Sequence, residues 1–225
     1  MNDEKAEVVQ APAWGWKAVR PRLGSAAREL VYRWQYLRER LNSPVIPGAS
    51  HVLKREIIRT YRERHGLTTF IETGTCLGDM VAAMLPDFER LHTIELSPYL
   101  HRRASSRFRR HPNVTVHLGD SAAVLKGVLE DCTDRVLFWL DAHYSGGVTV
   151  GSDIPVPIFE ELRLALTHPV RDHVILIDDA RCFDGTDGYP TLESLREFAA
   201  LLRPDYQLHV ESDVMRLVPS LAPDQ

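Results

Sequence analysis

The sequence predicts an α/β fold, in which a doubly wound and mostly parallel sheet carries helices on both faces. Apolar β-type runs alternate with helix-forming segments through most of the chain, and this alternation is typical of parallel sheets. In addition, an apolar run that ends at Glu72 meets a turn bracketed by Gly74 and Gly78, and a helix-forming segment follows from Met80 to Leu85. A strand, a glycine turn and a helix in this order bring backbone close to a nucleotide-like ligand.

The elements follow in order along the chain. We expect strands at 68–72, 91–95, 113–117, 136–141 and 173–178, and helices at 51–65, 79–85, 98–109, 121–130, 157–167 and 191–202. Two further strands, at 206–210 and 213–218, are separated only by Glu211 and Ser212. Two residues are too few for a crossover, so these strands form an antiparallel hairpin. Right-handed crossovers place the carboxyl ends of the parallel strands on one edge of the sheet.

Length and chain breaks set the domain organisation. A chain of 225 residues fits one domain with an appendage. Pro44, Pro47 and Gly48 break the chain, so we expect a leader and a basic amphipathic helix in residues 1–45 and one α/β domain in residues 46–225. The apolar stripe of this N-terminal helix suits packing on the domain or on a second subunit of a homodimer. An aromatic and basic helix can also rest on an anionic membrane surface.

Composition excludes several classes of protein. The net charge of −4 gives no reason to expect nucleic acid as a partner, and no apolar run approaches the roughly 18 residues of a membrane span. The first residues lack the order of a signal peptide. Three widely spaced cysteines form neither a disulfide framework nor a metal-binding pair. These features predict a cytoplasmic protein.

Polar residues cluster where the predicted parallel strands end. They are Glu72, Gly74 and Gly78 after the first strand, Glu95, Leu96 and Ser97 after the second, Gly119, Asp120 and Ser121 after the third, Asp141, His143 and Tyr144 after the fourth, and Asp178 and Asp179 after the fifth. In an open α/β sheet all of these line one crevice. A single acid at a strand end often only caps the next helix, but five strand ends in succession are harder to obtain by chance.

Two of these carboxylates suit a nucleoside. Glu95 lies 21 residues beyond Gly74, the interval at which a second-strand carboxylate meets a ribose. Its alternative role is that of a cap or surface residue before the helix that starts near Pro98. Asp120, with Ser121 beside it, suits an adenine amino group, and its alternative role is to cap the helix over 121–130.

The glycine turn argues against a dinucleotide. A loop that binds a pyrophosphate typically has the spacing G-x-G-x-x-G and no acidic residue beside it. Here Gly74 and Gly78 stand four residues apart, with Glu72 before the turn and Asp79 after it. Such a site suits an uncharged or cationic ligand that carries a ribose.

The successive motifs resemble those of class I S-adenosylmethionine-dependent methyltransferases, from about residue 50 to the C-terminus. The resemblance implies a Rossmann-like sheet of order 3-2-1-4-5-7-6 and S-adenosylmethionine as cofactor. Cys76 departs from the family pattern, because it stands at the usual middle glycine. The implied cofactor-binding residues are Glu72, Thr73, Gly74, Thr75, Gly78, Glu95, Leu96, Ser97, Gly119, Asp120, Ser121 and Asp141.

A narrower resemblance concerns metal. Asp141-Ala-His143 with Asp178-Asp179 is similar to the metal-dependent O-methyltransferases of the catechol and sugar types. It implies Mg²⁺ held by Asp141, Asp178 and Asp179. Alternatively, Asp178 and Asp179 fix a turn, and Asp179 pairs with Arg181. Since adjacent strand residues point to opposite faces, both aspartates bind one metal only if the strand has ended at Asp178.

The catalytic pair predicted for the site is His143 with Asp141. A histidine with an ordinary pKa near 6.5 can take a hydroxyl proton at neutral pH, and the alternative is a half-buried histidine bonded to backbone. The polar, glycine-rich segment 145–153 suits a lid as well as it suits a surface loop.

The resemblance implies an enzyme that methylates an oxygen. The acceptor would be a small molecule, namely a sugar or natural-product hydroxyl. Two alternatives stay open, which are another enzyme on the same fold (an aminopropyl transferase or an NAD-linked oxidoreductase) and a non-catalytic ligand-binding protein.

Overall fold

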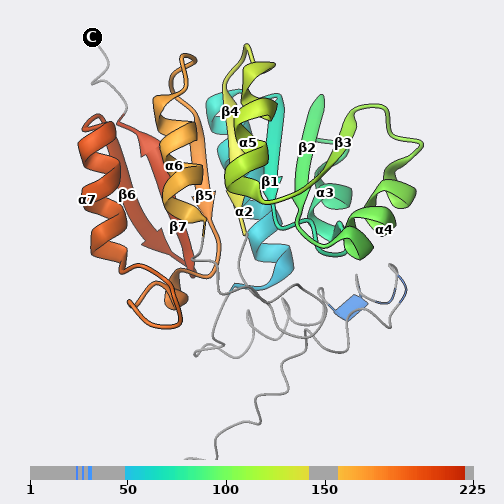
Figure 1. The fold of residues 1–225 in the computed structure, drawn as a ribbon, viewed down its shortest axis with the longest axis horizontal. Helices are drawn as coiled ribbons and strands as arrows, with labels where there is room; N and C mark the ends of the chain where they lie inside the picture. Colours follow the sequence, from blue (N-terminus) through green and yellow to red (C-terminus); the bar gives the residue numbers. More distant parts are fainter. Residues whose placement is uncertain (1–23, 25–26, 28–29, 32–48, 142–156, 221–225) are drawn as a thin grey trace, which may run out of the picture.

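The computed structural model describes residues 24, 27, 30, 31, 49–141 and 157–220. Within these residues, seven strands form one sheet in the order β3-β2-β1-β4-β5-β7-β6 (Figure 1). The strands are β1 (Thr69–Thr73), β2 (Arg90–Glu95), β3 (Val114–Leu118), β4 (Val136–Leu140), β5 (Val174–Ile177), β6 (Tyr206–Glu211) and β7 (Val214–Pro219). The first five strands pair in parallel, and β7 runs antiparallel to both β5 and β6. The predicted Rossmann-like fold, its strand order and its closing hairpin are confirmed.

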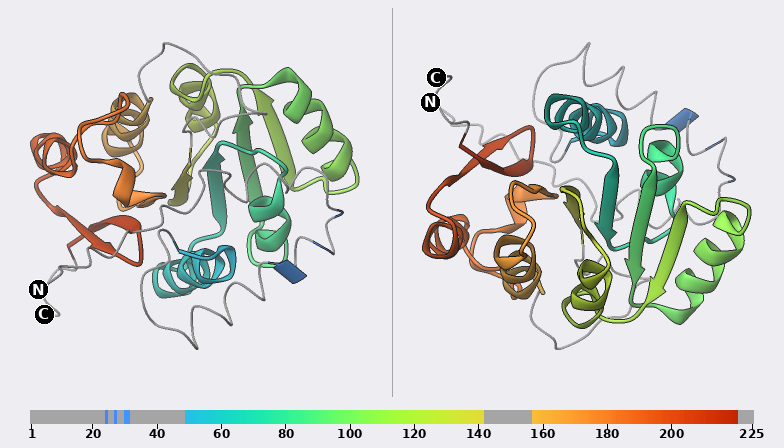
Figure 2. Two further views of the ribbon diagram at one scale, coloured as in Figure 1. Left: turned by 90° about the horizontal axis from the view of Figure 1, so that it is seen from below. Right: turned by 90° about the horizontal axis from the view of Figure 1, so that it is seen from above.

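Helices cover both faces of this sheet (Figures 1 and 2). One face carries α5, α6 and α7, and the other carries α2 and α3, with α4 packed beside them. The helices are α2 (His51–His65), α3 (Asp79–Met84), α4 (Pro98–Phe108), α5 (Ser121–Glu130), α6 (Ile158–Thr167) and α7 (Leu192–Leu202), and a 3₁₀ turn, η3, spans Ala180–Cys182. Right-handed crossovers explain the two layers, because the chain winds outward from β1 in one direction and from β4 in the other.

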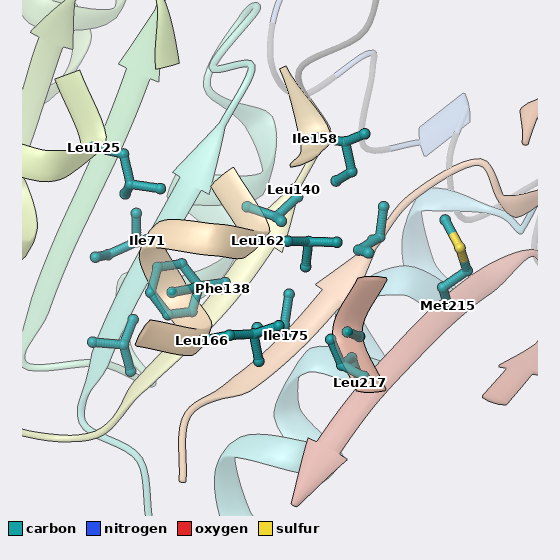
Figure 3. Close-up of a cluster of buried hydrophobic side chains, with 14 of the residues drawn as sticks. Ile71, Leu125, Phe138, Leu140, Ile158, Leu162, Leu166, Ile175, Met215 and Leu217 are labelled. Atoms are coloured by element: carbon teal, nitrogen blue, oxygen red, sulfur yellow. The ribbon is translucent and has the colours of Figure 1, made fainter. Parts of the chain in front are cut away.

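The sheet has a separate hydrophobic core on each face. Neighbouring strand residues point to opposite sides, so Phe138 and Leu140 of β4 meet α5 and α6, as Figure 3 shows. Leu137 and Trp139 of the same strand belong to the core under α2 and α3. All four are buried. Burial on both faces explains why β4 reads as an unbroken apolar run in the sequence.

Several parts predicted from the sequence remain predictions. The leader and nearly all of the basic helix in residues 1–45 lie outside the described residues, as do His143, Tyr144 and the glycine-rich segment 145–153. The described helices include none that combines the length and apolar character needed to cross a membrane.

A chain of histidine hydrogen bonds ties the amino edge of the sheet together. The Val136 backbone N–H donates to Nδ1 of His173 (3.0 Å), which fixes His173 as an acceptor at that nitrogen. Its other nitrogen, Nε2, then donates to Nδ1 of His168 (3.1 Å), and Nε2 of His168 donates to the Leu129 carbonyl (3.1 Å). This chain requires a neutral His173, and burial lowers its pKa to about 4.

We expect the His173→Asn variant to lose the acid sensitivity that this histidine gives the fold. The unfolded histidine takes a proton below about pH 6.5, whereas the folded one resists it down to about pH 4. Stability from His173 is therefore complete above pH 6.5 and falls as the pH drops through this window, by on the order of 2 kcal/mol. Urea denaturation of wild type and variant at pH 7.5 and pH 4.5 measures this. A stability difference between the two proteins that is the same at both pH values would contradict the expectation.

Candidate functional site at the carboxyl edge of the sheet

The turn after β1 is built on left-handed backbone. Gly74, Cys76 and Gly78 have φ values of 84°, 50° and 71°, a region that favours glycine. The N–H groups of Gly74 and Thr75 both donate to the Ile94 carbonyl of β2, at 3.0 and 3.2 Å. Cys76 stands where the methyltransferase motif that the turn resembles has its middle glycine, and its backbone adopts a conformation that favours glycine.

Helix α4 holds the far end of this turn. A Cβ built on Gly78 would lie 2.7 Å from Cε2 of the buried Phe108 ring. Next to it, Nη1 of Arg107 donates to the Leu77 carbonyl (2.5 Å) and to Oδ1 of Asp79 (2.7 Å). The charge of Asp79, which the sequence suggested would repel a phosphate, is therefore paired with an arginine. Sequence reasoning missed Arg107, because no local pattern links α4 to the turn.

Glu95 joins the turn to the end of β2. Its Oε2 accepts from the Cys76 N–H at 2.7 Å and its Oε1 accepts from the Ser97 N–H at 2.8 Å. It does not cap α4, because Ser97 is the N-cap and its Oγ accepts from the Leu100 N–H. Burial raises the pKa of Glu95, and the two backbone donors oppose that rise. The carboxylate is thus held in place before any ligand arrives.

Glu72 is buried between β1 and β2. Thr93 Oγ1 donates to its Oε2 at 2.7 Å, and so the Thr75 hydroxyl donates to Thr93, 2.5 Å away. Burial raises the pKa of Glu72 well above its ordinary value, and the charges of Asp141 and Glu95 raise it further. These three acids therefore lie near enough to interact, as their positions at neighbouring strand ends predict.

The end of β3 lies beside Glu95. The Gly119 N–H donates to the Glu95 carbonyl at 3.0 Å, and Leu96 is exposed at the same edge. Asp120 is the N-cap of α5, where its Oδ1 accepts from the Ala123 N–H at 3.3 Å. The capping role that the sequence allowed for Asp120 is thus observed, and contact with an adenine stays a prediction.

Glu161 is a buried acid that sequence reasoning missed. It lies in the first turn of α6 and is 1% exposed. Burial raises its pKa to about 7, while the hydroxyls of Ser121 and Thr73 oppose the rise. Both hydroxyls belong to residues predicted to bind the cofactor. The amphipathic pattern of α6 gave no sign that an acid would be buried there.

The aspartates that follow β4 and β5 meet at one point. One carboxylate oxygen from each of Asp141, Asp178 and Asp179 lies within 4.8 Å of the others. Strand β5 ends at Ile177, and Asp179 has a φ of 54°, so the chain leaves the strand before the acidic pair. The condition for both to face one cation is met, and metal binding itself stays a prediction.

A lysine from α2 reaches these aspartates. Nζ of Lys54 lies 2.5 Å from Oδ2 of Asp178 and 3.3 Å from Oδ1 of Asp179. Arg181 also pairs with Asp179 Oδ1, at 2.9 Å, and with Asp213. Burial opposes the charge of Lys54, but the carboxylates outweigh it and raise the pKa of the lysine. No motif in the sequence pointed to Lys54.

Lys54 also acts on the carboxyl that it contacts. Burial and the charge of Asp141 raise the pKa of Asp178, and Lys54 opposes that rise. The predicted catalytic pair is described only in part, because Asp141 belongs to this cluster and His143 lies outside the described residues. The role of His143 as a base stays a prediction.

Solved methyltransferases share this fold. The chain is similar to an O-methyltransferase from Bacillus cereus in complex with S-adenosylhomocysteine, with a TM-score of 0.54 and 17% identity, covering 87% of this chain and 91% of that chain. It is similar to the S-adenosylhomocysteine-bound methyltransferase PaMTH1 of Podospora anserina (TM-score 0.55, 16% identity, 96% of this chain and 99% of that chain). It is also similar to the O-methyltransferase TomG of Streptomyces achromogenes, involved in tomaymycin synthesis and in complex with S-adenosylmethionine. The TM-score is 0.53 and the identity 18%, covering 76% of this chain and 82% of that chain.

These likenesses establish the fold of class I S-adenosylmethionine-dependent methyltransferases, which the sequence motifs resemble. No protein-family model matches the chain, and no match is found among curated proteins.

We expect Gly78→Ala to destabilise the fold more than Gly66→Ala. Both glycines have positive φ, 71° and 60°, so each alanine carries the left-handed strain of roughly 1 kcal/mol. Only at Gly78 does the new Cβ overlap the Phe108 ring, which adds about 1–3 kcal/mol. Urea denaturation of the two variants measures the difference, with Gly66→Ala as the control. Equal losses would mean that the turn and α4 do not pack as described.

Proposed function

We propose that the protein is an S-adenosylmethionine-dependent methyltransferase that transfers the methyl group to a hydroxyl. The observation that carries the proposal is the convergence of Glu72, Glu95 and Asp141 around the turn after β1, where the Cys76 N–H donates to Glu95 and the Asp141 N–H donates to the Thr73 carbonyl at 3.2 Å. Each acid comes from a different strand of a sheet with the order 3-2-1-4-5-7-6. Carboxylates gathered at the carboxyl ends of such strands suit a cationic ligand that carries a ribose.

The residues of this edge fit the cofactor in three parts. Each oxygen of Glu95 already accepts one backbone N–H, and a carboxylate oxygen has room for a further donor, so both can accept from ribose hydroxyls. Gly119, Asp120 and Ser121 lie at the end of the next strand, where we place the adenine. We place the positively charged methionine part of the cofactor at the turn from Thr73 to Gly78, near the buried Glu72.

For this reaction the protein mainly has to align the methyl donor with the acceptor. When bound, S-adenosylmethionine supplies the methyl group on a sulfonium that leaves as a neutral thioether. The chain's own residues hold donor and acceptor in line, and such orientation can contribute several kcal/mol. The acceptor hydroxyl must lose a proton, and we assign that step to His143 with Asp141 beside it.

The acceptor class is inferred from resemblance. The similarity of Asp141-Ala-His143 and Asp178-Asp179 to the sugar-type O-methyltransferases favours a hydroxyl of a sugar or of another secondary metabolite. TomG, one of the structural neighbours, is an O-methyltransferase involved in tomaymycin synthesis, which also favours a small-molecule acceptor.

We expect Glu95→Gln to weaken binding of S-adenosylhomocysteine by about tenfold to hundredfold. The variant loses charge-assisted hydrogen bonds, which contribute roughly 1.5–3 kcal/mol. Isothermal titration calorimetry measures the affinity. Glu89→Gln is the matched control, because Glu89 is exposed and immediately precedes the same strand at its other end, and its affinity should equal that of wild type.

The same titration separates the alternatives. Wild-type protein that binds NAD tightly and S-adenosylhomocysteine not at all would refute the proposal in favour of an NAD-linked enzyme. An unchanged affinity in Glu95→Gln would remove Glu95 from the ribose site.

We also expect S-adenosylmethionine binding to release protons, up to about one per ligand. Burial raises the pKa of Glu72, and a cationic ligand beside the carboxyl would lower that pKa again, which favours loss of its proton on binding. Calorimetry in two buffers of different ionisation enthalpy detects the release. Glu72→Gln keeps the acceptor for Thr93 and should abolish most of it. Equal apparent enthalpies for wild type in both buffers would place the cation away from Glu72.

A further inference from the structure

We propose that the ammonium group of Lys54 is the resident cation of the aspartate cluster and takes the place of a divalent metal ion. The proposal deepens the methyltransferase function and rests on it for the meaning of the site. The cluster consists of Asp141, Asp178 and Asp179, whose oxygens converge as ligands of one cation would. The cation that the structure places there belongs to the protein itself.

Lys54 is built into the fold at this point. It lies in the first turn of α2, whose N-cap is Ser50, and its backbone N–H donates to the Ser50 carbonyl at 2.9 Å. Ile57, Ile58 and Tyr61 bury the helix against the sheet. The Lys54 side chain is nine-tenths buried. A lysine is rarely this buried without a charged partner, so the position is specified by the carboxylates that it meets.

The oxygens that Asp178 and Asp179 would offer to a metal already accept hydrogen bonds. Oδ2 of Asp178 accepts from Lys54, and Oδ1 of the same residue accepts from the Asp179 N–H at 2.7 Å. Oδ1 of Asp179 accepts from both Lys54 and Arg181, at 3.3 and 2.9 Å. With Lys54 in this place, the cluster does not fit a divalent ion.

The short distance between Lys54 and the aspartate oxygens prevents a metal ion from binding the cluster together with the lysine. Mg²⁺ binds oxygen at about 2.1 Å, and Nζ of Lys54 lies 2.5 Å from Oδ2 of Asp178. An ion on that oxygen would therefore lie at most about 4.6 Å from the ammonium. Both charges are positive and the site is buried, where screening by water and salt is weak. Either cation can hold the aspartates, but not both.

The lysine can also do what a metal would do for the acceptor. An ammonium group has three N–H donors, and the contacts to Asp178 and Asp179 use two of them. We assign the third to the acceptor oxygen, so Lys54 is a positioning residue that orients the hydroxyl without a metal.

The test is a titration of the full-length protein with Mn²⁺, followed by electron paramagnetic resonance of the free ion. We expect wild type to show no stoichiometric site at millimolar Mn²⁺. Lys54→Met leaves the three carboxylates without their cation, and we expect it to bind one Mn²⁺ at least tenfold more tightly than wild type. Lys54→Arg keeps the charge and should exclude the ion as wild type does. Lys126→Met removes an exposed lysine of α5 and serves as the matched control.

Two results would overturn the proposal. One is a wild-type protein that binds one Mn²⁺ at a site abolished by Asp178→Asn. The other is a Lys54→Met variant that folds, binds S-adenosylhomocysteine as wild type does and still binds no Mn²⁺. Should Lys54→Met fail to fold, a stoichiometric Mn²⁺ site in wild type or in Lys54→Arg would still refute the proposal. Cofactor binding is read separately by calorimetry, so failure of the methyltransferase assignment is distinguishable from failure of this proposal.

Discussion

The structure depends on the burial of carboxylates at one edge of a sheet that is itself covered on both faces. A buried charge is costly unless it finds a partner, and each acid finds a different kind. Glu72 accepts from a threonine hydroxyl, Glu95 from two backbone N–H groups, and Asp178 from a lysine. The turn after β1, the start of α4 and the first turn of α2 are where they are because these partners must reach the acids.

This arrangement makes the edge rigid and negative at the same time. The acids raise one another's pKa values, so the free protein carries repulsion that a cation relieves. Glu95 is fixed to the turn by Cys76 and to α4 by Ser97. A ligand that enters here therefore meets groups already in position, and little of its binding energy is spent on ordering them.

Most of the fold follows from sequence patterns, because its central strands β1, β4 and β5 are short and buried on both sides. The run Val136–Leu140 has no polar residue. The two-residue link between β6 and β7 was predicted at Glu211 and Ser212 and lies at Ser212 and Asp213, and a link this short requires a hairpin at either position. The acids at the strand ends follow from the same patterns, since parallel strands bring their ends to one edge. The bend after Ile177 does not follow from the sequence, because the end of a strand depends on its neighbours.

The site residues that could not be predicted from the sequence are those that the helices contribute. Lys54, Arg107 and Glu161 each sit in a segment with an ordinary helical pattern, and each meets its partner only when the helix packs; Lys54 lies 124 residues from Asp178. A motif of aspartates shows where negative charge is concentrated, but it does not show which cation binds there. Three carboxylates at one point attract a metal ion and a lysine ammonium alike, because both are cations. The choice lies with an upstream helix, so an acidic motif alone is weak ground for assigning a metal.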